Sequence, residues 1–132
     1  MKAAEVFKKL RLDKAENLLI VNAPDGYTQI LEDINYDSKP ATPKVGRYGF
    51  VQVFATSQTE MEKLLKEVEK AGVNDCIFWA CYPKGTGKIK SDIKRETLWN
   101  ALGLIGLRPV SQIAIDETWS ALRGRPADKV GK

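Results

Sequence analysis

The chain has 132 residues, of which 43% are hydrophobic and 29% charged, and these values predict one globular domain rather than a disordered or fibrous protein. It contains no histidine, which excludes catalytic pairs and metal sites that depend on an imidazole. No apolar run approaches the roughly 18 residues of a membrane span, and the N-terminus shows no signal-peptide core, so we expect a cytoplasmic protein without a membrane partner.

We expect residues 1–132 to form a single domain, with 127–132 as a flexible tail. The net charge of +4 is not spread evenly. The segment from Lys84 to Arg95 contains five basic residues and only one acidic residue, Asp92. The remaining charges balance, so the excess positive charge lies in this segment.

The first third of the chain predicts a short helix followed by a strand and a second helix. The amphipathic helix ends near Arg11, and the apolar run Leu18–Val21 predicts a strand that is buried on both faces. Apolar residues from Tyr27 to Ile34 then recur at helical spacing. The stretch from Asn35 to Gly49 is rich in turn formers, which predicts a connection with at most one short edge strand.

The middle third predicts a second and a third strand with a helix between them. The second strand covers Phe50–Ala55. Ser57 and Glu60 have the spacing of a capping box, and the helix that they start ends at Gly72. The nearly continuous apolar run Cys76–Tyr82 is typical of a central strand covered on both faces.

The last third predicts one helix and a hairpin. Ser91 is expected to cap the helix, which includes Trp99 and ends at Gly103 or Gly106. The final stretch, "PVSQIAIDETWSALRGRP", contains two strands joined too closely for a helical crossover, so they must pair antiparallel. We therefore expect an α/β fold, a three-layer Rossmann-like sandwich with a mostly parallel sheet and a C-terminal antiparallel hairpin. The last strand should lie beside the Cys76–Tyr82 strand.

The cysteines offer no disulfide or metal site. Cys76 and Cys81 lie five positions apart on one predicted strand, so their side chains point to opposite faces and are too far apart to bridge. We expect both thiols to be reduced and buried, and we expect no bound metal.

The loop "YPKGTGKIKS" between the third strand and the next helix is the clearest candidate for a binding site. A phosphate loop of the GxxxxGK[ST] type would need glycine in place of Tyr82 and a hydroxyl residue in place of Ile89. What remains is a weak, non-selective anion site, with a solvated loop as the alternative. Its residues would be Lys84, Gly85, Gly87 and Lys88.

The turn "NAPDGY" after the first strand is the candidate cofactor site, because ligands of such sheets bind at the carboxyl ends of strands. Its residues are Asn22, Asp25 and Gly26. A dinucleotide site would need the GxGxxG pattern, which is missing here. Helix-cap and turn roles are the alternative for Asp25 and Gly26, and we expect no cofactor.

Nucleic-acid binding through residues 84–95 is a further possibility. Single-strand binding combines positive charge with aromatic stacking platforms, and no aromatic residue lies between Lys84 and Arg95. Trp99 and Trp119 are expected to pack in the core. The pattern therefore argues against nucleic acid without excluding it.

Three stretches together carry a resemblance to known families: "LLIVNAPDGY", "FWACYPKGTGKIKSDI" and "DETWSALRGRP". They resemble a bacterial family of small Rossmann-like proteins that is described only as a domain of unknown function. The order of elements is more distantly similar to the S-adenosylmethionine-dependent methyltransferase fold. The resemblance implies a fold and no catalytic residues, because "NAPDGY" replaces the glycine-rich motif of the methyltransferases.

These observations lead to three hypotheses of function. The first is a non-catalytic Rossmann-like domain that binds a partner or a small anion. The second is a degenerate methyltransferase-like protein that binds a cofactor or a nucleotide. The third is weak nucleic-acid binding through the basic segment.

Overall fold

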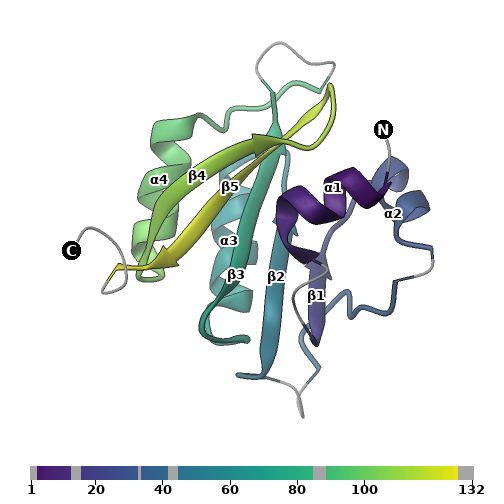
Figure 1. Cartoon of the computed structure of the whole chain (residues 1–132). Helices are drawn as coiled ribbons and strands as arrows, with labels where there is room; N and C mark the ends of the chain where they lie inside the picture. The colour runs from purple at the N-terminus through teal and green to yellow at the C-terminus, as the bar shows by residue number, and fades with distance from the viewer. Residues whose placement is uncertain (1–2, 13–15, 33, 42–44, 85–88, 128–132) are drawn as a thin grey trace.

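The computed structural model describes residues 3–12, 16–32, 34–41, 45–84 and 89–127. These residues form four helices and five strands (Figure 1). In chain order they are α1 (Ala3–Leu10), β1 (Leu18–Val21), α2 (Asp25–Ile30), β2 (Tyr48–Phe54), α3 (Gln58–Val68), β3 (Gly72–Pro83), α4 (Arg95–Leu104), β4 (Leu107–Ala114) and β5 (Trp119–Pro126). Among the described residues, no helix is long and apolar enough to cross a membrane.

The five strands form one mixed sheet in the order β1-β2-β3-β5-β4. β1, β2 and β3 run parallel, and β5 pairs antiparallel with both β3 and β4. The expected position of the last strand beside the Cys76–Tyr82 strand is confirmed. The expected mostly parallel sheet is wrong, because two of the four strand pairings are antiparallel and they extend over more residues. The cause is β5, which returns through a tight turn and inserts between β3 and β4.

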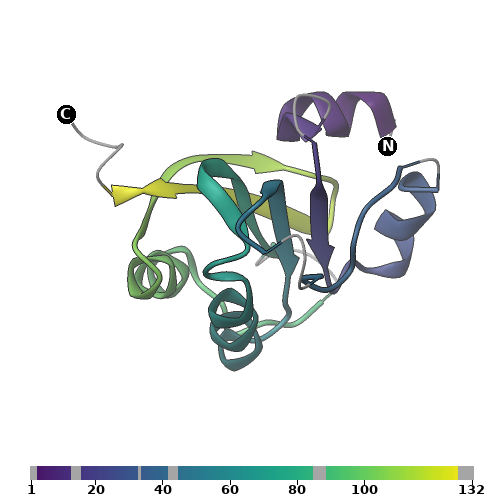
Figure 2. The same cartoon turned by 90° about the horizontal axis from the view of Figure 1, so that it is seen from below.

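Helices cover both faces of the sheet (Figure 2). Buried side chains of α3 and α4 pack on one face, around Val51, Phe78 and Leu122. Residues of α1 and α2 pack on the other face, around Phe50 and Trp79. The result is the expected three-layer arrangement, with β2 and the second half of β3, from Phe78 to Tyr82, buried in the middle.

The free edge of β1 is partly covered by the segment that follows α2. The backbone N–H of Ile20 donates to Asp37 O at 2.9 Å, and the N–H of Asp37 donates to Leu18 O at 2.9 Å. The hydroxyl of Tyr48 donates to the Asp37 carboxylate, which fixes this segment from the side of β2. At most one short edge strand was expected in this connection. Among its described residues ahead of β2, the strand pairing consists of this isolated bridge between Leu19 and Asp37.

The helix starts agree with the sequence for α3 and differ for α4. Ser57 Oγ accepts from the N–H of Glu60 at 3.2 Å, as a cap should. Ser91 does not cap α4, because the helix begins at Arg95 and Lys94 occupies the cap position. Ser91 Oγ instead accepts from Ile93 N at 3.1 Å, in a local turn ahead of the helix.

The tryptophans and cysteines show which predicted packing was correct. Trp119 is buried, as expected, whereas Trp99 is 45% exposed, so its predicted core role is wrong. Cys76 and Cys81 are free thiols that pack in the cores on opposite faces of the sheet, as predicted. Cys81 is fully buried and Cys76 only partly.

The C-terminal end of the described chain is attached to the α4–β4 turn. Ala127 N donates to Gly106 O at 3.0 Å, and Gly106 has a positive φ of 79°, as favoured at the end of a helix. The remaining residues of the predicted tail, 128–132, lie outside the described part of the chain.

Candidate functional site

The carboxyl ends of β1 and β2 are joined by a side chain. Asn22 follows β1 with a φ of 62°, and its Nδ2 donates to Phe54 O, the last residue of β2, at 2.8 Å. Asparagine tolerates this left-handed conformation better than most residues. The amide of Asn22 therefore bridges the two strand ends at which a cofactor of a Rossmann-like sheet would be sought.

Asp25 and Gly26 form the first turn of α2 and are exposed. Pro24 occupies the cap position, and its carbonyl accepts from the N–H groups of Tyr27 and Thr28 at 2.9 and 3.0 Å. A Cβ on Gly26 would contact nothing within 4 Å. The space around Gly26 therefore gives no reason why a glycine is required there.

A groove of about 740 Å³ lies beside Asn22 at the end of β1, between α3 and residues 38–40. Its volume lies in the range of small-molecule sites. The lining combines apolar residues with both signs of charge: Val21, Asn22, Ser38, Lys39, Pro40, Glu60, Lys63, Leu64, Glu67 and Val68. Of the three predicted cofactor residues, only Asn22 contributes to it.

The structure describes Lys84 alone among the four predicted anion-binding residues; Gly85, Gly87 and Lys88 lie outside the described residues. Lys84 N donates to Thr118 O at 2.8 Å, which extends the pairing of β3 with β5 by one residue. Its side chain lines a cavity of about 520 Å³ between α1 and the β4–β5 turn. The charged residues of this cavity are mixed: Glu5, Lys9, Lys84, Asp116 and Glu117. Lys84 and Asn22 thus line different cavities.

Asp92, which follows the basic loop in the sequence, contacts the N-terminus of α3. Asp92 Oδ1 accepts from Gln58 N, the first residue of α3, at 2.8 Å. The single acidic residue of the basic segment is therefore bound at the N-terminus of α3, where a negative charge is favourable. Because the cap of α4 is Lys94 and not Ser91, the positive end of the helix lies three residues further along the chain than predicted.

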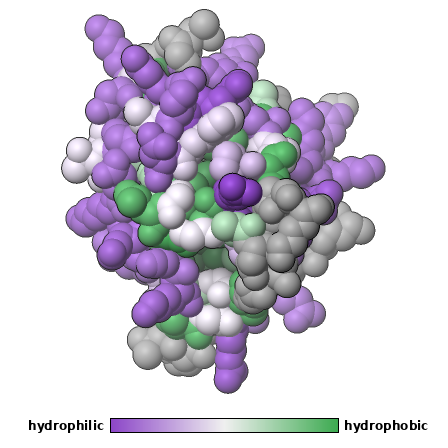
Figure 3. All heavy atoms as spheres, turned by 90° about the vertical axis from the view of Figure 1, so that its left-hand side faces the viewer, coloured by the Kyte–Doolittle hydropathy of each residue, from purple (hydrophilic) through white to green (hydrophobic). Residues whose placement is uncertain are grey.

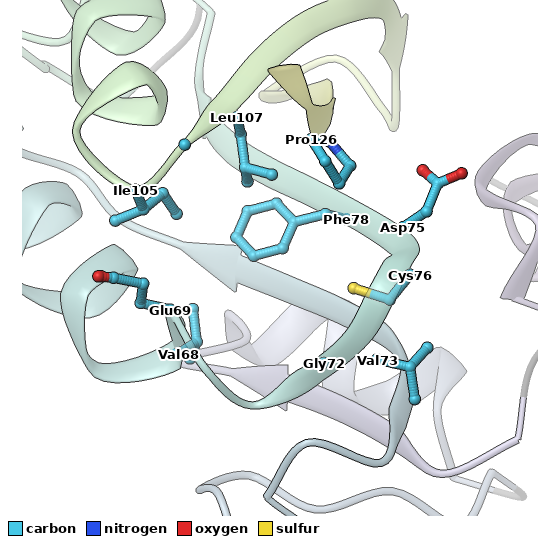
Figure 4. Close-up of a pocket in the computed structure, with 11 residues that line it drawn as sticks. Val68, Glu69, Gly72, Val73, Asp75, Cys76, Phe78, Ile105, Leu107 and Pro126 are labelled. Atoms are coloured by element: carbon cyan, nitrogen blue, oxygen red, sulfur yellow. The ribbon is translucent and has the colours of Figure 1, made fainter. Parts of the chain in front are cut away.

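A third cavity, which the sequence analysis did not predict, lies at the start of β3 (Figure 4). Tyr48 is opposite Gly72 and Phe50 is opposite Ile77, so four residues of β3 face a single residue of β2. This bulge opens a cavity of about 250 Å³, into which Cys76 Sγ points while the Asp75 carboxylate points away. The turn formers in "GVND" were the available signal.

The two thiols are poor nucleophiles at neutral pH. Burial, and then the charge of Asp75, raises the pKa of Cys76 from 9.0 to about 11. Burial raises the pKa of Cys81 to about 12. Both thiols therefore stay protonated, whereas a reactive cysteine needs a lowered pKa. Within the described ranges, no cluster of three or more possible metal ligands occurs.

The outer side of α4 and β4 carries apolar side chains in contact with solvent (Figure 3). Trp99, Leu104 and Val110 are 45%, 76% and 38% exposed. Trp99 and Arg95 line a shallow groove of about 250 Å³ beside β4. An aromatic ring thus lies near the basic segment after all, which weakens the argument drawn against nucleic acid from the sequence.

Comparison with known proteins finds similarity in the fold. No family model matches the chain, and no curated protein matches its sequence. A crystal structure of a putative type 11 methyltransferase from Sulfolobus solfataricus is similar, with a TM-score of 0.55 and 11% sequence identity. The match covers 98% of this chain and 82% of that one. The chain therefore has a Rossmann-like α/β fold of methyltransferase type, with identity too low to extend the likeness beyond the fold.

Proposed function

We propose that the protein is a non-catalytic Rossmann-like domain that acts by binding a partner or a small anion. The observation that carries the proposal is the Asn22 Nδ2 to Phe54 O bond of 2.8 Å. In this type of sheet a ligand enters a crevice at the carboxyl ends of the strands, and here a side chain bridges the two ends. The protonated thiols of Cys76 and Cys81 add support, since neither is suited to covalent catalysis.

For the anion, the candidate contacts are Lys84, Gly85, Gly87 and Lys88, because the excess charge of the chain is concentrated around them. The test is a titration of the labelled protein with sulfate, followed by NMR of the backbone amides of residues 82–91. We expect saturable shifts in the wild type and their loss in the Lys84→Ala, Lys88→Ala double variant. Shifts that persist unchanged in the double variant would assign the binding elsewhere.

A second candidate function is binding of a methionine-derived cofactor or a nucleotide. The groove of about 740 Å³ beside Asn22 favours it, together with the fold shared with a putative methyltransferase. Thermal unfolding with S-adenosylmethionine or S-adenosylhomocysteine distinguishes the two proposals, because a ligand at 100 times its Kd stabilises a protein by about 2.7 kcal/mol. A clear rise in Tm would favour the cofactor and contradict the first proposal.

Weak nucleic-acid binding through residues 84–95 is the third candidate, and the exposed Trp99 near Arg95 is the observation in its favour. Phosphate contacts make affinity fall steeply as salt rises, whereas stacking on an indole depends little on salt. A short single-stranded oligonucleotide should therefore bind more weakly in Trp99→Ala at every salt concentration. Equal affinity of the variant and the wild type would remove Trp99 from such a site.

A further inference from the structure

A group of arginines lies on the α1 face of the sheet, away from the basic loop, and it includes Arg11, Arg123 and Arg125. The indole Nε1 of Trp79 donates to Leu10 O at 2.8 Å, which fixes the C-terminal end of α1 over β3. Trp79 is paired with Arg123 across β3 and β5. Arg11, the residue after Leu10, is thereby brought to the same face as Arg123.

The third arginine of this face is already paired. Arg125 lies two positions after Arg123, so it points to the same side of the strand. Its Nε and Nη2 donate to the two carboxylate oxygens of Asp75 at 2.9 and 2.7 Å. Both oxygens of this carboxylate thus contact Arg125, which leaves Arg11 and Arg123 as the arginines of this face that act on each other.

Arg123 holds a hydrogen-bond donor that is not used within the described part of the chain. Its Nε is buried and makes no hydrogen bond there. The pKa of the Arg123 guanidinium is lowered first by burial and then by the charges of Arg11 and Arg125. Like charges therefore act on a partly buried cation, and an anion bound beside Arg11 and Arg123 would offset this repulsion.

We propose that Arg11 and Arg123 bind the phosphate group of a small molecule on the α1 face of the sheet. A phosphate monoester carries a charge close to −2 at neutral pH, so it can offset the charges of Arg11 and Arg123 together. Guanidinium groups bind such oxygens through paired N–H donors. Arg11 is exposed and Arg123 only partly buried, so a ligand can reach both. The site goes beyond the proposed function because it shares no residue with the Lys84 loop.

The experiment titrates inorganic phosphate into the full-length labelled protein and follows the Nε–H signals of the arginines by NMR. In the wild type, the Arg123 signal should shift and saturate, and acetate, a monoanion, should bind more weakly. Arg11→Gln and Arg123→Gln should each weaken phosphate binding about tenfold, because each removes one of the paired donors. Arg47→Gln is the matched control, since Arg47 is an exposed arginine in the turn before β2 and lies outside this group.

The same variants decide between the two anion sites. Lys84→Ala, Lys88→Ala should leave the Arg123 response unchanged. If phosphate binding is lost in that variant and retained in Arg123→Gln, the arginine site is wrong while the proposed function stands. If Arg123→Gln does not fold, the exposed Arg11→Gln alone carries the test. An Arg123 signal that does not move with phosphate overturns the proposal.

Discussion

Two tryptophans mark two differently built regions of this molecule. Trp79 on the central strand β3 is 2% exposed, and its Nε1 bonds Leu10 O, so one side chain fills the core and attaches α1. Trp99 on α4 is 45% exposed beside β4. β3 has neighbours on both sides and helices on both faces, whereas β4 is an edge strand with mostly exposed side chains. The comparison teaches that stability is concentrated in the centre, and that the α4–β4 side has surface available for binding.

The largest expected loss of stability comes from replacing Trp79, and the same replacement at Trp99 is the comparison. Trp79→Ala should lower the free energy of unfolding by about 3–5 kcal/mol, since it leaves a cavity and unpairs the Leu10 carbonyl. Trp99→Ala should change it by no more than about 0.5 kcal/mol. Urea unfolding followed by circular dichroism measures both. Equal losses in the two variants would break the comparison.

The buried thiols predict a loss of stability at alkaline pH. Folding raises the pKa of Cys76 from 9.0 to about 11, so the unfolded chain releases this proton at a lower pH than the native protein. The stabilisation is complete below pH 9.0 and is lost as the pH rises from there to about 11. In this range the free energy of unfolding falls by about 1.4 kcal/mol per pH unit for one such group. Urea unfolding of the wild type and Cys76→Ala over this range should show a shallower slope in the variant.

Two glutamines test the same contrast with hydrogen bonds. Gln52 is fully buried on β2, accepts from Tyr27 OH at 2.8 Å, and its Nε2 lies 3.4 Å from Cys81 Sγ. Gln52→Leu should cost about 1–3 kcal/mol, because Tyr27 then keeps a buried hydroxyl without an acceptor. Gln112, exposed on β4, donates to Tyr82 OH at 3.0 Å. Gln112→Leu should cost at most about 1 kcal/mol. Thermal unfolding measures both losses of stability. A larger loss in Gln112→Leu than in Gln52→Leu would contradict the view that stability is concentrated in the centre of the sheet.

The smallest effect is expected at the bulge of β3. The Asp75–Arg125 pair is bidentate, but its side chains are 28% and 35% exposed, so solvent screens it. Asp75→Asn should lower the free energy of unfolding only slightly at low salt and by less at high salt. Asparagine also tolerates the φ of 59° at this position, which isolates the effect of charge. A loss independent of salt would point to backbone strain in place of the ion pair.

The candidate site was less predictable than the strands. The Asn22 bond depends on Phe54, 32 residues away, and no local pattern announces it. The predicted burial of Trp99 was wrong because helical spacing identifies which residues share a face of the helix. It does not show how far β4 covers that face. The arginine group was missed because Arg11 and Arg123 come from opposite ends of the chain, and the Trp79–Leu10 hydrogen bond brings them to one face of the sheet.

The sequence alone determined the strands β1, β2 and β3, the cap of α3 and the placement of β5 beside β3. Apolar runs, a serine cap and a tight final turn are local features, and each leaves the chain few alternatives. Tertiary structure alone decided the mixed sheet, the bulge at Gly72–Ile77 and the placement of Arg11 and Arg123 on one face of the sheet. These depend on which distant segments pair and in what register, and such contacts are set by packing of the whole chain rather than by neighbouring residues.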